Sequence, residues 1–405
     1  MSLHRKAGQL LFGTFIAQLI TLLTLPVLTK LVTPTEFGKY TQTLFLVATL
    51  LPFATLRLES LTVSVSDGLL AGRLAKLGLI SSTLLTLLFL PLFLLIVSQF
   101  SVNLVIGIYP FLFIAIVLIS QSFALVLNQY NLRLKRYKKI MTGSVLQNST
   151  TSILQIFASI LNPIYEFLAA SFAAGRLTVL IVDTRKILEI LQFKLEIKMI
   201  KSIIQKFWKS SLILIVGAFL ETFIFSGINL FAGLKYGQEI AGYLGLALLI
   251  FAVPGTLIGS SFTSVIFSEY DPHEKANVKI KKILKTIILI SLATSVFITY
   301  LFAGIAQIFL SEEWHESIEL ISKLGIPIGI NILWISSASI MYKNEEFGKY
   351  LSFGVLRLIL SILTASLFVM GGNSWQTVVL SYFLSGSLVL LLPIYSTYQR
   401  LLKNP

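Results

Sequence analysis

Stretches of about 20 apolar residues, separated by short polar breaks, recur along this 405-residue chain. A helix of that length crosses roughly 30 Å of hydrocarbon. A membrane β-barrel would instead require segments of about ten residues that alternate in polarity, which is not the pattern seen. The sequence therefore predicts an all-α integral membrane protein with twelve transmembrane helices, near residues 9–31, 41–66, 77–98, 104–127, 141–161, 164–183, 211–234, 241–267, 286–310, 321–342, 351–371 and 376–398.

The composition and the placement of charge support this interpretation. Hydrophobic residues make up 56% of the chain and charged residues 12%, while the net charge is +14. Most of the 32 basic residues fall in every second inter-span segment, which is the positive-inside pattern. We therefore expect a multi-pass protein of the inner (cytoplasmic) cell membrane with both termini in the cytoplasm. We expect no nucleic-acid partner, because the basic surplus is explained by topology.

Metal chemistry is not indicated by the residues available. The chain has no cysteine and three histidines, all in predicted polar segments. We therefore expect no metal site and no cofactor, apart from a coupling H⁺ or Na⁺ ion.

The longest connection between spans, residues 185–209, divides the chain near its middle. Within it the apolar residues recur at helical spacing, and lysines follow one position later: Phe193, Ile197, Ile200 and Ile204, with Lys194, Lys198 and Lys201. This pattern predicts a basic amphipathic helix on the cytoplasmic membrane surface. We interpret 185–209 as a linker between an N-terminal six-helix lobe, 1–184, and a C-terminal six-helix lobe, 210–405. A regulatory or partner-binding role is the alternative.

The two predicted lobes contain a sequence repeat. Glu36-Phe37-Gly38-Lys39-Tyr40 is matched by Glu239-Ile240-Ala241-Gly242-Tyr243, half a chain later. Further pairs at a similar offset, which drifts from 202 to 211, are Pro52 with Pro254, and Gly175 with Gly386. Six spans separate the copies, so we expect two parallel-repeat six-helix bundles around a central cavity. Transporters with such repeats carry their cargo at the interface between them.

Three segments together resemble a known family. They are Leu31-Val32-Thr33-Pro34-Thr35-Glu36-Phe37-Gly38-Lys39-Tyr40, Leu56-Arg57-Leu58-Glu59-Ser60 and the basic loop 133–139. In this pattern the chain is similar to the polysaccharide and O-antigen flippases of the multidrug/oligosaccharidyl-lipid/polysaccharide exporter superfamily. The resemblance implies transport of an undecaprenyl-pyrophosphate-linked oligosaccharide, such as an O-antigen or capsular or exopolysaccharide repeat, from the cytoplasmic to the outer leaflet by alternating access. Its partners would be that lipid-linked glycan, the bilayer and polysaccharide polymerases.

Five ionisable residues lie inside predicted spans: Arg57, Glu59, Arg176, Glu221 and Arg357. Placing an ionisable side chain in the hydrocarbon costs on the order of several kcal/mol. We therefore expect each of these residues to have a functional or structural role. A guanidinium binds a pyrophosphate through paired hydrogen bonds. We therefore expect Arg57, Arg176 and Arg357 to contact the substrate headgroup. The alternative for each is structural, either an ion pair that holds two helices together or a side chain reaching to the membrane surface.

The two glutamates are candidates for ion coupling. Glu221 and Glu59 would carry a proton or help to hold Na⁺, because burial favours the protonated form of a carboxyl group. The alternative is that each pairs with an arginine. On a continuous helix, Arg57 and Glu59 would point about 200° apart and could not pair with each other.

Glycan recognition would use amide and aromatic side chains. Asn331 and Trp334, three residues apart on one helical face, are the candidates. Packing in the core or against lipid is the alternative for Trp334.

Two other functions fit parts of the pattern. A multidrug or cation antiporter of the same superfamily should favour an acidic cavity, whereas these spans carry an excess of arginine. A membrane glycan polymerase or ligase commonly needs a large domain outside the bilayer, and the longest predicted outer segment has about a dozen residues. No nucleotide-binding loop of the Walker type is present. We therefore expect a transporter and not an enzyme.

Overall fold

The computed structural model describes residues 3–99, 108–269, 278–344 and 346–403, and every regular element within these ranges is a helix. This confirms the predicted all-α fold. By their contacts, the residues form two compact units, Met1–Gln238 and Glu239–Pro405, which are described separately below.

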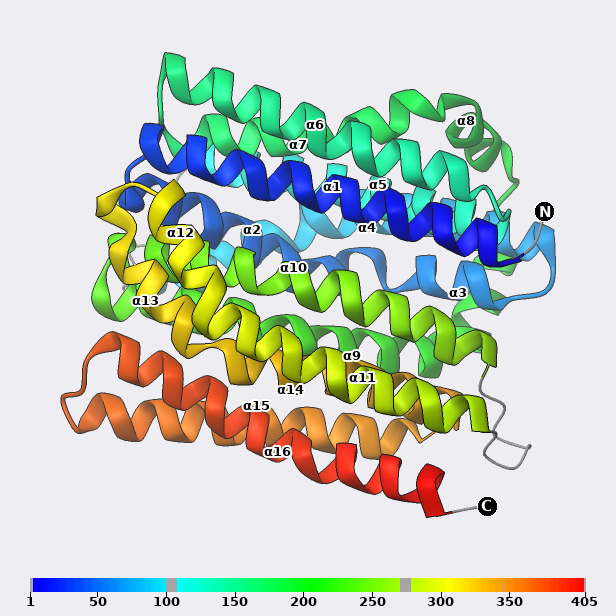
Figure 1. Ribbon diagram of the computed structural model, residues 1–405. Helices are drawn as coiled ribbons and strands as arrows, with labels where there is room; N and C mark the ends of the chain where they lie inside the picture. The colour runs from blue at the N-terminus through cyan, green and yellow to red at the C-terminus, as the bar shows by residue number, and fades with distance from the viewer. Residues whose placement is uncertain (1–2, 100–107, 270–277, 345, 404–405) are drawn as a thin grey trace. The chain divides into compact units, whose positions relative to one another are not determined.

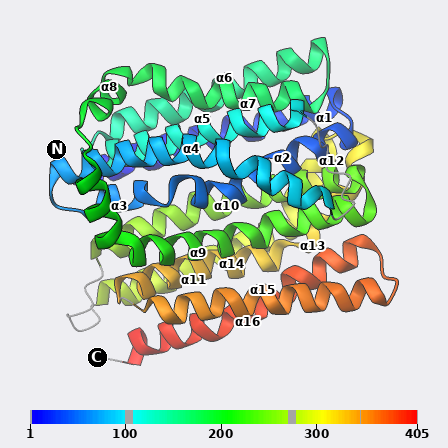
Figure 2. The ribbon, with the colours of Figure 1, turned by 180° about the vertical axis from the view of Figure 1, so that it is seen from behind.

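The first unit is a bundle in which α1 packs against α6, α6 against α7, and α5 against both α4 and α7. Figures 1 and 2 show α6 running alongside α1 and α7. The unit contains α1 (Leu3–Leu31), α2 (Pro34–Thr55), α3 (Leu58–Ser64), α4 (Gly68–Gln99), α5 (Ile108–Arg133), α6 (Tyr137–Leu161), α7 (Tyr165–Val182), α8 (Thr184–Gln192) and α9 (Ile197–Tyr236).

In the second unit, α14 packs against α11 and α16, and α16 pairs with α15. Figure 1 shows α15 and α16 as an antiparallel pair at the red end of the colour scale. The elements are α10 (Gln238–Glu269), α11 (Val278–Val296), a π-helical turn (Phe297–Phe302), α12 (Ala303–Phe309), a 3₁₀ turn (Glu312–Trp314), α13 (His315–Lys323), α14 (Gly325–Lys343), α15 (Phe347–Met370) and α16 (Trp375–Lys403).

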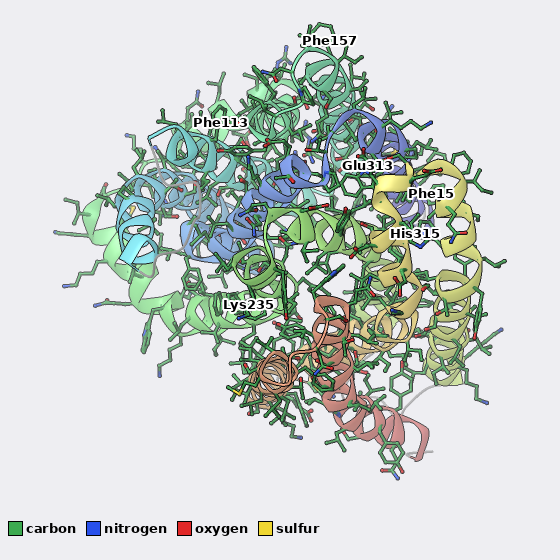
Figure 3. All side chains as sticks on the ribbon, turned by 90° about the vertical axis from the view of Figure 1, so that its left-hand side faces the viewer. Phe15, Phe113, Phe157, Lys235, Glu313 and His315 are labelled. Carbon is green, nitrogen blue, oxygen red and sulfur yellow. The ribbon has the colours of Figure 1, made fainter. Side chains whose placement is uncertain are left out.

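The helices have the length and composition needed to cross a bilayer. Within the described ranges ten of them do so individually, and the bent pair α2–α3 would make an eleventh span. The remaining predicted span is α6, which is long enough at 25 residues but is unusually polar. Its inward face carries buried Gln147 and Gln155, while its outward face exposes Ile153, Phe157 and Ile160. Figure 3 shows Phe157 pointing away from the unit, so α6 presents an apolar stripe outward.

The predicted linker does not form one separate amphipathic helix. Residues 193–196 lie outside the helices, and α9 then continues without interruption from the linker into the seventh predicted span. Ile203 is buried instead of Ile204, which is 59% exposed. Because α9 packs on α2, contacts group it with the first unit. The lobe boundary at residue 210, which rests on the sequence repeat, stays a prediction.

The segment Glu36–Tyr40 begins α2 and ties it to α7. The Thr33 side chain caps the helix by accepting a hydrogen bond from the Glu36 backbone N–H at 3.4 Å, and Pro34 takes the first helical position. One Glu36 carboxylate oxygen lies 2.5 Å from Lys39 Nζ, and the other accepts the backbone N–H of Tyr165, at the start of α7. In the second unit the matching Glu239 instead accepts the hydroxyl of Tyr243 on its own helix.

Candidate functional site

Helix α2 is broken inside the second span. Leu56 and Arg57 have φ values of 51° and 54°, and α3 leaves at 58° to α2. This break brings Arg57 Nη1 to 3.3 Å from Oε1 of Glu59. The sequence expectation that these two residues cannot pair is therefore wrong, because it assumed a continuous helix turning about 100° per residue.

Side chains from two other helices hold the break in place. The hydroxyl of Ser211, on α9, donates to the Leu56 carbonyl oxygen at 2.5 Å, so this group is satisfied although the helix stops there. Arg133, in the last turn of α5, donates to three carbonyl oxygens at the end of α3, those of Thr62, Val65 and Ser66. The sequence analysis placed Arg133 only in a basic loop. The position of Arg133 at the end of α5 predicts hydrogen bonds to the last carbonyl oxygens of α5 itself, so no signal in the sequence indicated its contacts with α3.

Glu59 is fully buried beside the break. Its Oε1 faces Arg57 and accepts a hydrogen bond from the Ser60 hydroxyl at 3.4 Å. Its Oε2 is buried without a hydrogen-bond partner among the described residues, although Thr55 lies close by. A buried carboxylate oxygen with spare capacity is costly unless something compensates it, so this oxygen is a candidate acceptor for a proton or a small cation.

Arg176 lies half-buried on α7 in a second polar cluster. Its guanidinium carbon is 4.3 Å from the centroid of the Phe172 ring, which is a cation–π arrangement. The Tyr40 hydroxyl of α2 interacts electrostatically with the Arg176 guanidinium. The same hydroxyl accepts a hydrogen bond from Nε2 of Gln155, on α6, at 2.7 Å. Among the described residues, no carboxylate forms a salt bridge with Arg176 and no acceptor reaches its Nε. We call these four residues the Arg176 cluster.

The two polar sites of the first unit are separate. Tyr40 lies near the start of α2 and Thr55 ends it, so about 22 Å of helix axis separates them. The structure therefore brings Arg57 together with Glu59, and places Arg176 elsewhere along the bundle.

In the second unit, Arg357 is buried on α15 with 4% of its surface exposed. Its guanidinium interacts electrostatically with the hydroxyl of Tyr382, on α16. Gly386, one turn further along α16, packs directly against the Arg357 side chain. Arg176 on α7 and Arg357 on α15 therefore each interact with the hydroxyl of a buried tyrosine, Tyr40 and Tyr382 respectively.

The glycan candidates of α14 are buried within the second unit. Asn331 is 9% exposed and Trp334 is 3% exposed. The Trp334 ring stacks on Tyr350 of α15, with centroids 5.8 Å apart and planes 5° apart. This stacking favours the packing role that the sequence left open for Trp334.

Glu221 is exposed on α9, whereas the sequence suggested a buried carboxylate. The inward row of this helix is Leu220, Ile224 and Ile228, and Glu221 lies about 100° around the helix from that row.

Comparisons with solved structures show the fold. The chain aligns with the inward-facing form of a multidrug resistance MATE family transporter of the MOP superfamily at 17% identity and a TM-score of 0.63, covering 99% of this chain and 95% of the other. It aligns with the lipid II flippase MurJ, in an inward closed conformation, at 14% identity and a TM-score of 0.71, covering 95% and 86%. A MOP superfamily transporter from Pyrococcus furiosus, described as having a binding pocket of reverse polarity, gives 17% identity, a TM-score of 0.62 and coverage of 98% and 95%.

Sequence comparison shows the family. No curated protein matches the chain individually. A model of the family described as "Polysaccharide biosynthesis protein" matches residues 27–319, which is well over half of the sequence. The chain therefore belongs to this polysaccharide biosynthesis family and has the fold of the multidrug/oligosaccharidyl-lipid/polysaccharide exporter superfamily.

Proposed function

We propose that this protein is a flippase for an oligosaccharide linked to undecaprenyl pyrophosphate, such as an O-antigen or capsular repeat. It would work in the cytoplasmic membrane with both termini inside, and carry the glycan to the outer leaflet by alternating access. The family match to polysaccharide biosynthesis supports a glycan substrate, and the fold shared with a lipid II flippase supports a lipid-linked one.

The observation that carries the proposal is the state of Arg176. It lies inside a membrane helix, rests on the Phe172 ring, and no described carboxylate neutralises it. Because no carboxylate occupies it, this guanidinium keeps its N–H donors for an anionic ligand. Its planar fork of donors suits a phosphate group, which it can bind through two parallel hydrogen bonds. We assign Arg176 the first contact with the pyrophosphate.

The other predicted contacts take secondary roles in this proposal. Arg57 is 27% exposed at the break of α2 but shares its charge with Glu59, so it would bind the headgroup only when that pair loosens. Arg357 and Asn331 are buried in the second unit and would act after a rearrangement that exposes them. Trp334 would support Asn331 through its stack on Tyr350.

Ion coupling would use the two carboxylates. A proton or Na⁺ at Glu59 Oε2 would weaken its attraction for Arg57 and release that arginine for the substrate, which links ion binding to headgroup binding. Glu221, exposed on α9, is the second candidate.

The alternative is a multidrug or cation antiporter, which the MATE fold similarity and the buried Glu59 favour. The two functions make opposite demands on Arg176. A cationic drug would be repelled by it, so its removal would leave drug export unchanged or improve it.

The test replaces Arg176 in a strain that lacks the chromosomal gene and depends on a plasmid copy for glycan export. Losing one charge-assisted hydrogen bond costs roughly 1.5–3 kcal/mol, so Arg176→Ala should lower export on the order of ten- to a hundredfold. Arg176→Lys should retain an intermediate activity, because it keeps the charge but loses the planar fork.

The matched control is Lys285→Ala, which removes one exposed positive charge from α11, two turns after its first residue. Export with this control should stay near the wild-type level. Protein level in the membrane is measured for every variant. Normal export by Arg176→Ala at a normal protein level would contradict the assignment of Arg176.

A further inference from the structure

A cavity of about 600 Å³ lies at the junction of α7 and α8, in the first unit. Figures 1 and 2 both show α8 at the end of this unit where α1 begins, which is its predicted cytoplasmic end. The lining comes from the start of α6, the end of α7 and the first turns of α8. The lining residues are Arg136, Lys139, Ile181, Val182, Asp183, Thr184, Arg185, Lys186 and Glu189.

Both carboxylates in the lining are already occupied. Asp183 is held by the Arg136 guanidinium through two hydrogen bonds, at 2.7 and 3.1 Å. Glu189 pairs with Lys186 and accepts the Tyr130 hydroxyl at 3.3 Å. The two acids therefore cancel two of the four lining cations.

Two cations remain available to a ligand. Lys139 and Arg185 are exposed at the cavity and neither forms a salt bridge with a carboxylate in the part of the chain that the structure describes. Among the described residues, the hydrogen bond that Lys139 Nζ donates goes to the carbonyl oxygen of Val182, at 3.3 Å. The cavity thus has an uncompensated charge of about +2, which suits a phosphate group.

The same cavity has an apolar edge. Ile181 lines it and is 74% exposed, and Leu188 and Leu191 are exposed on α8. The opposite side of α8 packs inward through buried Ile190, while Lys76 of α4 donates to the carbonyl oxygens of Leu191 and Phe193 and so holds the end of the helix. An exposed apolar face beside basic residues is typical of a helix lying at a membrane surface.

We propose that this cavity binds the phosphate headgroup of an acidic phospholipid of the cytoplasmic leaflet. Lys139 and Arg185 contact the phosphate, and the acyl chains pass over Ile181, Leu188 and Leu191 into the hydrocarbon. A free phosphate or a soluble phosphate ester would use the two cations but would have no use for the apolar edge. The proposal does not depend on the identity of the transported substrate.

The experiment measures lipid retention by the purified full-length protein in neutral detergent, by native mass spectrometry with phosphatidylglycerol or phosphatidylcholine added. The wild type should retain phosphatidylglycerol preferentially. The double variant Lys139→Gln/Arg185→Gln should lose affinity for phosphatidylglycerol on the order of tenfold, since basic residues near a membrane surface each add substantially to acidic-lipid binding. The double variant Lys30→Gln/Lys235→Gln removes the same charge from exposed positions in the last turns of α1 and α9, outside the cavity, and should stay within about twofold of the wild type.

Two further measurements separate the lipid from a free phosphate. Ile181→Ser keeps every charge, and it should weaken phosphatidylglycerol binding if acyl chains use that edge. Millimolar inorganic phosphate should leave phosphatidylglycerol bound. The proposal is overturned if both double variants lose the lipid equally, if Ile181→Ser has no effect, or if inorganic phosphate displaces the lipid from the wild type.

Discussion

Gly386 on α16 lies against Arg357 on α15, so that a Cβ atom at Gly386 would stand 3.4 Å from Cγ of Arg357. The first unit repeats this contact: a Cβ at Gly175 on α7 would stand 2.7 Å from the Gln147 carbonyl oxygen on α6. Gly175 and Gln147 are the sequence partners of Gly386 and Arg357 in the predicted repeat, at offsets of 211 and 210. The same small residue therefore brings the last two helices of each half together, and the first half has an amide where the second has an arginine.

The two glycines should differ in their tolerance of alanine. At Gly175 the added Cβ would meet the Gln147 backbone oxygen and, at 1.9 Å, Thr151 Oγ1. At Gly386 the nearest atom is Ser361 Oγ, at 2.5 Å. Because a backbone atom cannot rotate away, Gly175→Ala should cost about 1–3 kcal/mol, and Gly386→Ala less. Thermal unfolding in detergent measures both.

Second-site changes control this comparison. Ser361→Ala should restore most of the stability lost in Gly386→Ala, because it removes the clashing hydroxyl. Thr151→Ala should restore only part of the loss in Gly175→Ala, because the Gln147 carbonyl remains. Full rescue in both units would show that the Gln147 contact is not limiting.

The Arg57–Glu59 pair predicts an asymmetric result. Glu59 is fully buried and Arg57 is partly exposed, so Arg57→Gln leaves a carboxylate in the core, whereas Glu59→Gln leaves an arginine that can reach water. Arg57→Gln should therefore destabilise the protein more, by about 2–4 kcal/mol against about 1 kcal/mol. The double variant Arg57→Gln/Glu59→Gln should be more stable than Arg57→Gln alone. Additive losses in this cycle would mean that the two side chains do not interact.

Arg133 should hold the end of α3. Arg133→Gln removes a charged donor from three carbonyl oxygens, which should cost about 2 kcal/mol, and should speed amide hydrogen exchange in residues 58–66. Arg136→Gln is the comparison variant, since Arg136 instead pairs with Asp183. Equal protection of α3 in wild type and Arg133→Gln would contradict this role.

On the opposite side of the predicted membrane, acid should weaken one contact between α13 and α16. Hydrogen bonds from Lys323 and Gln376, at 2.6 and 3.1 Å, lower the pKa of Glu319 below its ordinary value of 4.5. The folded pKa lies below the unfolded one, so the contribution is complete above about pH 4.5 and is lost as the pH falls through the lowered pKa. The Glu319 and Lys323 side chains are both partly exposed, which limits the loss of stability in acid to about a few tenths of a kcal/mol. Glu319→Gln should remove this pH dependence from the unfolding curve, and an unchanged dependence would assign it elsewhere.

Much of the fold follows from the sequence because long apolar runs determine where helices can cross a membrane. The break in α2 does not follow from it, since neither Leu56 nor Arg57 is a glycine or proline, and its stability comes from Ser211 and Arg133 far along the chain. For the same reason the sequence could not predict the Arg57–Glu59 pair.

The burial of single aromatic residues could not be predicted from the sequence either. Trp314 lies at a predicted span end, where tryptophan is typical of the membrane interface. It is instead fully buried and packs edge-on against Tyr243, with ring centroids 6.0 Å apart. The fold of the short segment between α12 and α14 decides this, and hydropathy carries no information about it.

The most direct test of the proposed function reconstitutes the purified protein into liposomes that contain a fluorescently labelled undecaprenyl-pyrophosphate oligosaccharide, and measures how much label a membrane-impermeant quencher can reach. With wild-type protein, label should move between leaflets until nearly all of it is quenched. Without protein, quenching should stop near the fraction that starts in the outer leaflet, and with Arg176→Ala it should rise beyond that fraction on the order of ten- to a hundredfold more slowly than with the wild type. Equal, partial quenching with wild-type and protein-free liposomes, under every ion gradient tested, would contradict the proposal that this protein is a lipid-linked glycan flippase.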